Sequence, residues 1–350
     1  MWLLKVSTER DRLELHHFNS TDEVEARGGY AILSHVWTRD PTDGKPDEQS
    51  FQEVRRLQAE DVSYRDWRTS RKVRNCIRVA KEYGFGWVWL DTCCIDKTSS
   101  AELEEAINSM YRWYAEARIC FAYLSDVIDP KEPLDGEKSA FRNSAWFKRC
   151  WTLQELIAPH NLIFLSSEWQ YLGTKSGLAS LLQTITGIDM DVLTFYRPLE
   201  QVSVGRRMSW AARRHATRVE DEAYSLLGLF GVSLPTIYGE GRRAFQRLQE
   251  EIMRRSPDPT LFAWGRMMLP QDIPRCHIAK APFAHSDSSS FFAPNPSAFK
   301  QSGRFRRAPT SKIRDAVRKW CAVTDADTAS RSLLGVEQHV AHTVFAARSP

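Results

Sequence analysis

"YAILSHVW", residues 30–37, is the stretch on which the expected fold depends. Its first four residues form a short apolar run with a β-branched isoleucine, directly after Gly28 and Gly29. Such a run is typical of a buried strand, and this strand would end near Ser34 and His35. A buried strand needs neighbouring strands and covering helices, so the question is whether the rest of the first half supplies them.

Apolar runs and helical patterns alternate after this first strand. In chain order, the expected elements are a hairpin at 2–6 and 13–18, a helix at 70–83, a strand at 87–91, a helix from 99 to about 118, a strand at 119–124, a helix at 145–157 and a strand at 161–166. Strands that alternate with helices predict an α/β fold, a parallel sheet flanked by helices with the 30–34 strand in its centre.

The sequence pattern changes from alternating strands and helices to mainly helical after residue 175, and to low complexity after residue 265, which predicts the domain organisation. Residues 1–175 are expected to form the α/β domain, and 176–265 a mainly helical C-terminal extension packed on it. Residues 266–350 are low in complexity, with Ser, Pro and Arg concentrated in 286–312, and are expected to be largely disordered.

Composition narrows the class of protein. The 350 residues are 42% hydrophobic and 26% charged, as in a soluble globular protein. The net charge of +4, from 48 basic and 44 acidic residues, is too balanced to favour nucleic acid as a partner. Seven cysteines without a CxxC pair favour a reduced compartment. No run approaches 18 apolar residues, so no membrane span and a cytoplasmic location are expected.

Polar and aromatic side chains gather where the first two strands end. Ser34, His35 and Trp37 follow the first strand, and Asp91 ends the second. In open α/β sheets ligands bind beyond the carboxyl ends of the strands, so these residues are candidates for a binding site. Other roles remain open: His35 as a structural histidine, Asp91 as a cap for its loop, and Ser34 as a partner of the loop backbone.

The helix around "RCWTLQELIAP", residues 149–159, carries the other candidate residues. Trp151 and Glu155 are four residues apart, about one helical turn, and would share a face. The apolar stripe expected to face the sheet is Trp146, Cys150, Leu153 and Ile157. Glu155 lies roughly opposite this stripe, so it is either an exposed surface glutamate or a carboxylate presented to the site.

Metal and nucleotide motifs are absent. There is no P-loop and no HExxH, and the histidines lack metal-ligand spacing, so no metal site is expected. Asp91 and Asp96 alone are a weak Mg²⁺ signal. Cys93 and Cys94 favour buried thiols over a nucleophile, because nothing nearby in the sequence would lower their pKa.

Three segments together resemble the fungal heterokaryon-incompatibility (HET) domain. They are "YAILSHVW", "VWLDTCCIDK" with the helix and strand that follow it, and "RCWTLQELIAP". Residues 208–252 resemble the segment that often follows this domain, and Lys97 departs from the glutamine usual there. The resemblance implies an effector of fungal non-self recognition and regulated cell death. Its partner would be a second copy of the chain or another incompatibility protein.

The HET domain is also similar to the TIR domain, a flavodoxin-like fold, and some TIR domains cleave NAD⁺ at the nicotinamide–ribose bond. The catalytic glutamate of those domains lies in a "WCxxE" helix, and "CWTLQE" places Glu155 in the comparable helix, with inverted order and a spacing of four. The resemblance therefore implies catalysis by Glu155 on NAD⁺ as substrate, without a cofactor. The implied substrate-binding residues are Ser34, His35, Trp37, Asp91 and Trp151. The alternative is a non-catalytic TIR-like adaptor that signals by self-association or partner binding.

Overall fold

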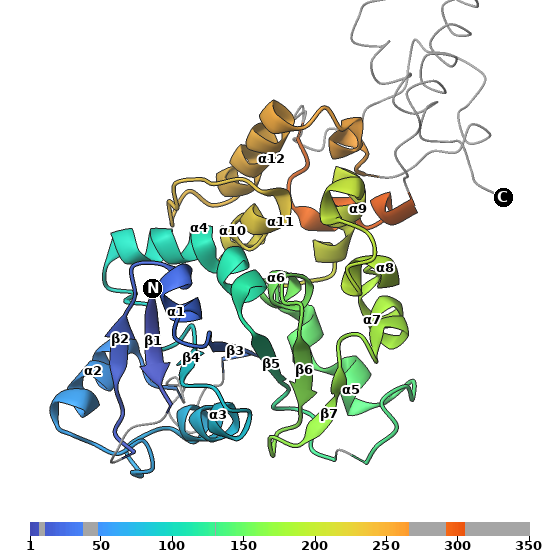
Figure 1. The fold of residues 1–350 in the computed structure, drawn as a ribbon. Coiled ribbons are helices and arrows are strands. Elements are labelled where there is room, and N and C mark those ends of the chain that lie inside the picture. Colours follow the sequence, from blue (N-terminus) through green and yellow to red (C-terminus); the bar gives the residue numbers. More distant parts are fainter. Residues whose placement is uncertain (7–10, 38–47, 130, 266–291, 305–350) are drawn as a thin grey trace, which may run out of the picture. The chain divides into compact units, whose positions relative to one another are not determined.

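The computed structural model describes residues 1–6, 11–37, 48–129, 131–265 and 292–304 (Figure 1). The chain divides into two compact units. The first unit is Met1–Arg197 with Arg214–Gly239, and the second is Pro198–Arg213 with Glu240–Pro350. The sheet and all the candidate site residues belong to the first unit.

A seven-stranded sheet forms the centre of the first unit. Its strands are β1 (Trp2–Lys5), β2 (Leu15–His17), β3 (Ala31–His35), β4 (Trp87–Trp89), β5 (Ile119–Tyr123), β6 (Leu162–Leu165) and β7 (Tyr171–Thr174). Their order across the sheet is β2-β1-β4-β3-β5-β6-β7. The strand at 30–34 is central, as the sequence predicts, and all five residues of β3 are buried.

The four inner strands, β4, β3, β5 and β6, are parallel, which confirms the expected core of the sheet. The sheet as a whole is mixed, however, because β1 runs antiparallel to β4 and β7 antiparallel to β6. The short connection between β6 and β7 forms a hairpin, which produces an antiparallel pair, and β1 pairs with β2 in the same way. The four strands that the sequence predicts to be parallel are parallel, and the antiparallel strands at the two edges add to them.

The order of the parallel strands locates the binding edge. Across the sheet the parallel strands lie in the order β4, β3, β5, β6. The second parallel strand in the chain therefore lies outside the first, which is the strand order of flavodoxin-like folds. The direction of the connections reverses between β3 and β5. Ligands in such folds bind at this reversal, beyond the carboxyl ends of the strands.

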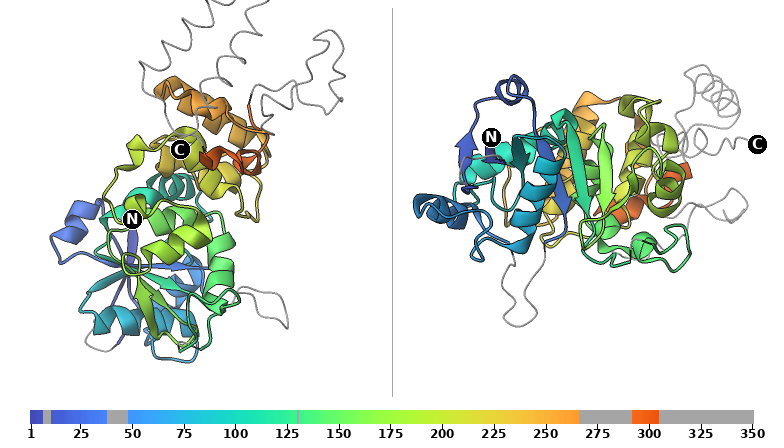
Figure 2. Two further views of the ribbon diagram at one scale, coloured as in Figure 1. Left: turned by 90° about the vertical axis from the view of Figure 1, so that its right-hand side faces the viewer. Right: turned by 60° about the horizontal axis from the view of Figure 1, so that its bottom comes forward.

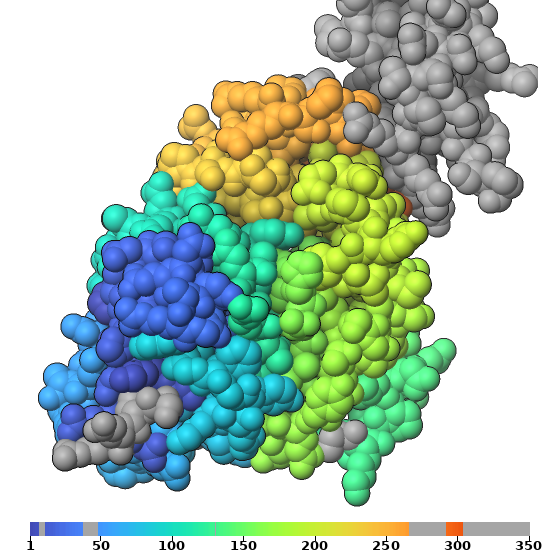
Figure 3. Space-filling model, viewed as in Figure 1, coloured from blue at the N-terminus to red at the C-terminus, as the bar shows by residue number. Residues whose placement is uncertain are grey.

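Helices cover both faces of the sheet (Figures 1 and 2). α3 (Arg71–Glu82) lies on one face, and α4 (Ser100–Glu116) with α6 (Thr152–Ile157) on the other. Ser99 caps α4 as predicted, with its side chain accepting from the Glu102 amide. The Tyr114 hydroxyl of α4 then donates to the Leu33 carbonyl of β3 at 2.8 Å, which fixes the helix on the central strand. In the space-filling view, side chains close the spaces between these ribbons on the visible face (Figure 3).

The helix predicted for 145–157 is broken in two. A 3₁₀ turn, η1 (Ala145–Lys148), precedes α6, and the residues between them do not continue the helix. Arg149 has an extended backbone (φ −78°, ψ 141°) because it forms a parallel bridge with His215. Pairing with a distant segment thus overrides the local helical pattern.

The remaining helices lie both before residue 176 and after it, where a mainly helical region is expected. The first unit also contains α1 (Thr21–Glu25), α2 (Phe51–Ala59), α5 (Ala140–Asn143), α7 (Ala179–Thr186), α8 (Met190–Leu193), α10 (Asp221–Tyr224) and α11 (Leu227–Phe230). The second unit contains η2 (Leu199–Gln201), α9 (Val204–Ala211), α12 (Arg243–Arg255), η3 (Pro259–Phe262), η5 (Pro296–Phe299) and η6 (Ser302–Arg304). Within the described ranges, no helix has the length and apolar character that crossing a bilayer requires.

The tail expected to be disordered is described only in part. Residues 292–304 include η5 and η6, and the Phe299 side chain is fully buried. The rest of 266–350 lies outside the described residues.

Candidate functional site

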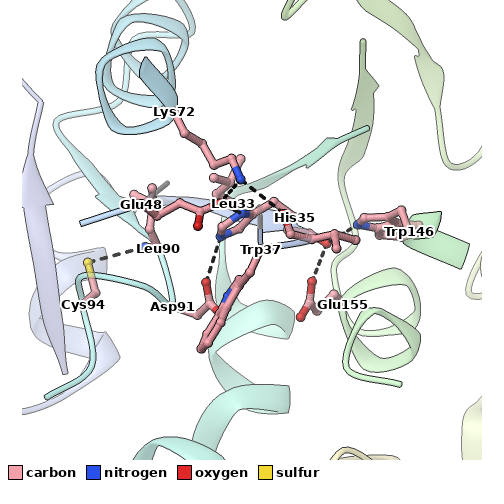
Figure 4. Close-up of polar contacts among 12 residues, drawn as sticks. Leu33, His35, Trp37, Glu48, Lys72, Leu90, Asp91, Cys94, Trp146 and Glu155 are labelled. Carbon is pink, nitrogen blue, oxygen red and sulfur yellow. Dashed lines mark hydrogen bonds and ion pairs between the residues drawn. The ribbon is translucent and has the colours of Figure 1, made fainter. Parts of the chain in front are cut away.

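Ser34 and Glu155 meet at the carboxyl end of the central strand, and Figure 4 shows Glu155 and Trp146 near this strand end. The Ser34 hydroxyl donates to Glu155 Oε2 at 2.5 Å, and it accepts a hydrogen bond from Trp146 Nε1 at 2.8 Å. Trp146 packs edge-on against Phe164 of β6, with ring centroids 5.7 Å apart, so its indole is held by the sheet. The serine is thereby fixed on both sides and aimed at the carboxyl group.

Glu155 is buried, with 6% of its surface exposed, and every residue of α6 is buried as well. Of the two alternatives that the sequence leaves open for Glu155, its burial excludes the exposed surface glutamate. Burial raises the pKa of Glu155 to about 8, and the negative charge of Asp91 acts in the same direction. The hydrogen bond from Ser34, the nearby Tyr114 side chain and the charge of Arg214 oppose this rise in the pKa.

His35, Asp91 and Trp37 form a second group beside the first. His35 Nε2 lies 2.9 Å from Asp91 Oδ1, and Trp37 Nε1 donates to Asp91 Oδ2 at 2.7 Å. The Lys97 ammonium lies 3.8 Å from the centre of the Trp37 ring, in a cation–π contact. Although burial raises the pKa of Asp91, its bonds to His35 and Trp37 and the charge of Lys97 lower it to about 2.

A buried ion pair supports His35 from the other side. Glu48 Oε1 lies 3.8 Å from His35 Nδ1 and forms a short ion pair with Lys72 of α3. Lys72 also donates to the Val36 carbonyl at 3.2 Å. Successive side chains of a strand point to opposite faces, so His35 turns toward α3 whereas Ser34 turns toward α6. The two groups meet at the strand end, where Asp91 and Glu155 point to the same side in Figure 4.

The short helix that carries Glu155 is held at its carboxyl end by Lys175. The Lys175 ammonium donates to the carbonyls of Leu156 at 3.2 Å, Ile157 at 3.3 Å and, more closely, Pro159. These are carbonyls that a helix leaves unpaired at its end. A six-residue helix is unstable by itself, so tertiary contacts of this kind fix the position of Glu155.

Trp151 does not join the group around Ser34. Its indole bonds to the Asp221 carboxylate, which also accepts from the Tyr238 hydroxyl at 3.0 Å. Trp151 is the N-cap residue of α6 and has helical backbone angles (φ −62°, ψ −38°), but its side chain lies toward Asp221 and not toward Ser34. Five of the six candidate residues therefore converge at the strand ends, and Trp151 instead anchors the 214–239 segment.

The weak metal and thiol signals do not form sites. Asp91 bonds to His35 and Trp37, whereas Asp96 accepts from Gln52 at 2.5 Å and from Thr98 at 2.6 Å. Among the described residues, no three His, Cys, Asp or Glu side chains are placed to share a metal ion. A hydrogen bond with Cys94, together with burial, raises the pKa of the Cys93 thiol, which leaves it protonated near neutral pH.

Comparisons with known proteins match the part of the chain that contains β3, β4 and β5. Residues 30–139 match the family described as "Heterokaryon incompatibility protein (HET)". The chain carries a HET domain. It is 45% identical over 235 residues to the vegetative incompatibility protein HET-E-1 of Podospora anserina, an alignment that covers 64% of this chain and 16% of that protein. Residues 243–325 match a domain of unknown function, DUF8212, and no solved structure matches the chain.

Part of the site lies beyond the matched HET residues. Trp146, Glu155 and Arg214 follow residue 139 in the chain but belong to the same compact unit as Ser34. Sequence analysis gave no site role to Tyr114 and Trp146, because both lie in apolar helical stripes that are typical of core residues. Glu48, Lys72 and Arg214 carry no sequence signal, because burial of a charged residue depends on what folds over it.

Proposed function

We propose that this chain is a HET-domain effector of fungal non-self recognition and regulated cell death, and that it cleaves NAD⁺ at the nicotinamide–ribose bond. The observation that carries the proposal is the Glu155 carboxyl group, buried and bonded to Ser34 beside the point where the sheet connections reverse. The reaction consumes NAD⁺ and water and yields nicotinamide, ADP-ribose and a proton.

The chemistry requires one well-placed anion. Nicotinamide is cationic in NAD⁺ and leaves as a neutral base, so positive charge develops on the ribose, where a carboxylate stabilises it. A bound nicotinamide cation favours ionisation of Glu155, because a nearby opposite charge lowers the pKa of a carboxyl group. Substrate binding and proton release from Glu155 are thus coupled.

The second group supplies surfaces for the rest of the substrate. The Trp37 side chain is 47% exposed, and Asp91 holds its indole nitrogen. An indole is suited to stack on a flat ring, and the Lys97 cation beside it is suited to a phosphate. These roles make Trp37 and Asp91 binding residues and Glu155 the catalytic residue.

The proposed test measures products directly. Purified full-length chain, at concentrations that allow self-association, is incubated with NAD⁺, and nicotinamide and ADP-ribose are quantified. The parent should release both in equal amounts. Glu155→Gln should reduce the rate on the order of a hundredfold, as expected for the loss of one preorganised electrostatic contact. Glu137→Gln, which changes an exposed glutamate, is the matched control and should retain the parent rate.

The adaptor alternative makes a different prediction for the same proteins. A parent that self-associates and kills a fungal host while leaving NAD⁺ intact would rule out the catalytic proposal. If Glu155→Gln then abolishes killing, the charge of the buried Glu155 supports signalling through the structure of the domain and not through catalysis. The chain spans only 16% of the length of HET-E-1, so its partners and its effect on cells are part of the proposal.

A further inference from the structure

Arg214 is a buried cation in an unfavourable place. Its side chain lies at the start of α6, where Nη1 donates to the Arg149 carbonyl at 2.9 Å and to Thr152 Oγ1 at 2.9 Å. Only 9% of its surface is exposed, and its buried Nη2 has no hydrogen-bond partner. It makes no ion pair with a carboxylate of the described residues. A buried guanidinium without such a pair costs free energy.

Helix capping does not explain this placement. The amino end of a helix carries partial positive charge, so a cation there is repelled and an anion is favoured. The position is nevertheless enforced, because the backbone of His215 pairs with the chain before α6: the Cys150 amide donates to the His215 carbonyl at 2.9 Å, and the His215 amide to the Lys148 carbonyl at 2.6 Å. The segment 214–239 thus holds Arg214 against α6.

The positive charge of Arg214 favours the ionised form of Glu155. Thr152, which holds the guanidinium, is three residues before Glu155 and therefore shares its side of the helix. The other groups that act on Glu155 come from several neighbouring elements: Ser34 of β3, Asp91 after β4, Tyr114 of α4 and Cys120 of β5. Among these groups Asp91 carries a negative charge, and Arg214 carries the positive charge that offsets it.

We propose that Arg214 is a positioning residue that keeps Glu155 available in its charged form, which makes the 214–239 segment part of the active site. This inference rests on the proposed function for its catalytic meaning, whereas its physical core is the charge coupling between Arg214 and Glu155. A merely structural Arg214 would stabilise the fold without affecting the ionisation of Glu155.

The test follows ionisation of Glu155 without relying on turnover. Full-length chain is labelled with ¹³C at glutamate side-chain carboxyl groups, and the Glu155 signal is the one lost in Glu155→Gln. Arg214→Gln should move the titration midpoint of this signal upward by about one pH unit, since loss of a nearby opposite charge raises a carboxyl pKa. Arg214→Lys, which keeps the charge, should move it much less. Arg213→Gln, a neighbouring exposed arginine, should leave it unchanged.

Turnover measured on the same variants separates the two proposals. The acid limb of kcat/KM should shift with the carboxyl signal, so that Arg214→Gln loses on the order of tenfold near neutral pH and recovers at high pH. A signal that does not move overturns the inference, whatever the turnover. A signal that moves in a parent without turnover upholds the coupling and overturns the NAD⁺ proposal. If Arg214→Gln does not fold, Thr152→Val removes the hydroxyl that holds the guanidinium and should shift the signal in the same direction.

Discussion

The Ser34 hydroxyl and the Glu155 carboxylate are 2.5 Å apart although 121 residues separate them in the chain. The serine belongs to the central strand, and the glutamate to the helix between the third and fourth parallel strands. Their contact therefore spans the reversal point of the sheet, where binding sites of this fold class occur. The following predictions start from this contact and from the packing around it.

Ser34→Ala should destabilise the protein. The change removes the donor to Glu155 and the acceptor of Trp146 Nε1, and it leaves both groups buried. A buried polar group without its partner costs about 1–3 kcal/mol, so the urea midpoint should fall accordingly. Ser180→Ala, at an exposed helical serine, should have an effect below about 0.5 kcal/mol. Equal midpoints for Ser34→Ala and the parent would contradict the hydrogen-bond geometry.

Glu155→Gln should become more stable than the parent as the pH rises. Burial raises the folded pKa of Glu155 to about 8, above the ordinary value of 4.5 expected in the unfolded chain. The folded state therefore binds the proton more tightly, and the parent loses stability as the pH rises from 4.5 through 8. Glutamine cannot ionise and avoids this loss.

The check is thermal unfolding of parent and variant between pH 5 and 9. The melting temperatures should be close near pH 5, and the variant should melt at least about 2 °C higher near pH 9, where about 1 kcal/mol corresponds to 2–4 °C. Glu137→Gln should show no such pH-dependent difference. A constant difference across the range would mean that Glu155 does not titrate there.

Asp91→Asn should lower the pKa of Glu155. The negative charge of Asp91 is one of the causes that raise this pKa, and asparagine removes the charge while keeping the size of the side chain. The midpoint of the Glu155 carboxyl signal should move downward, opposite to the shift expected for Arg214→Gln. Movement in the same direction for both variants would show that conformational change, and not charge, controls Glu155.

Gly228→Ala should destabilise the first unit. A Cβ atom at Gly228 of α11 would overlap the Tyr111 side chain of α4. Overpacking of this kind typically costs about 1–3 kcal/mol, which should lower the melting temperature by several degrees. Gly86→Ala is the control, because a Cβ atom there meets no atom within 4 Å. A variant at Gly228 as stable as the control would contradict the close approach of α11 to α4.

Local sequence patterns account for the elements and for their arrangement in the core. The apolar run at 30–33 predicts a buried central strand, and the alternation that follows predicts four parallel strands in their observed direction. Ser99 predicts the start of α4, since a side-chain cap acts on amides only a few residues away. Such features are readable because their causes lie within one helical turn or one strand.

Only the tertiary structure decides which side chains meet at the strand ends. Glu155 is buried because neighbouring elements cover α6, whereas the helical pattern alone leaves open whether Glu155 is exposed or faces the site. Pairing of Arg149 with His215 breaks the predicted helix and brings Arg214 to Thr152. The sequence by itself determined strands, helices and candidate residue types, because periodicity is local. The partners and the charge state of those residues depend on contacts between distant segments, which periodicity does not encode.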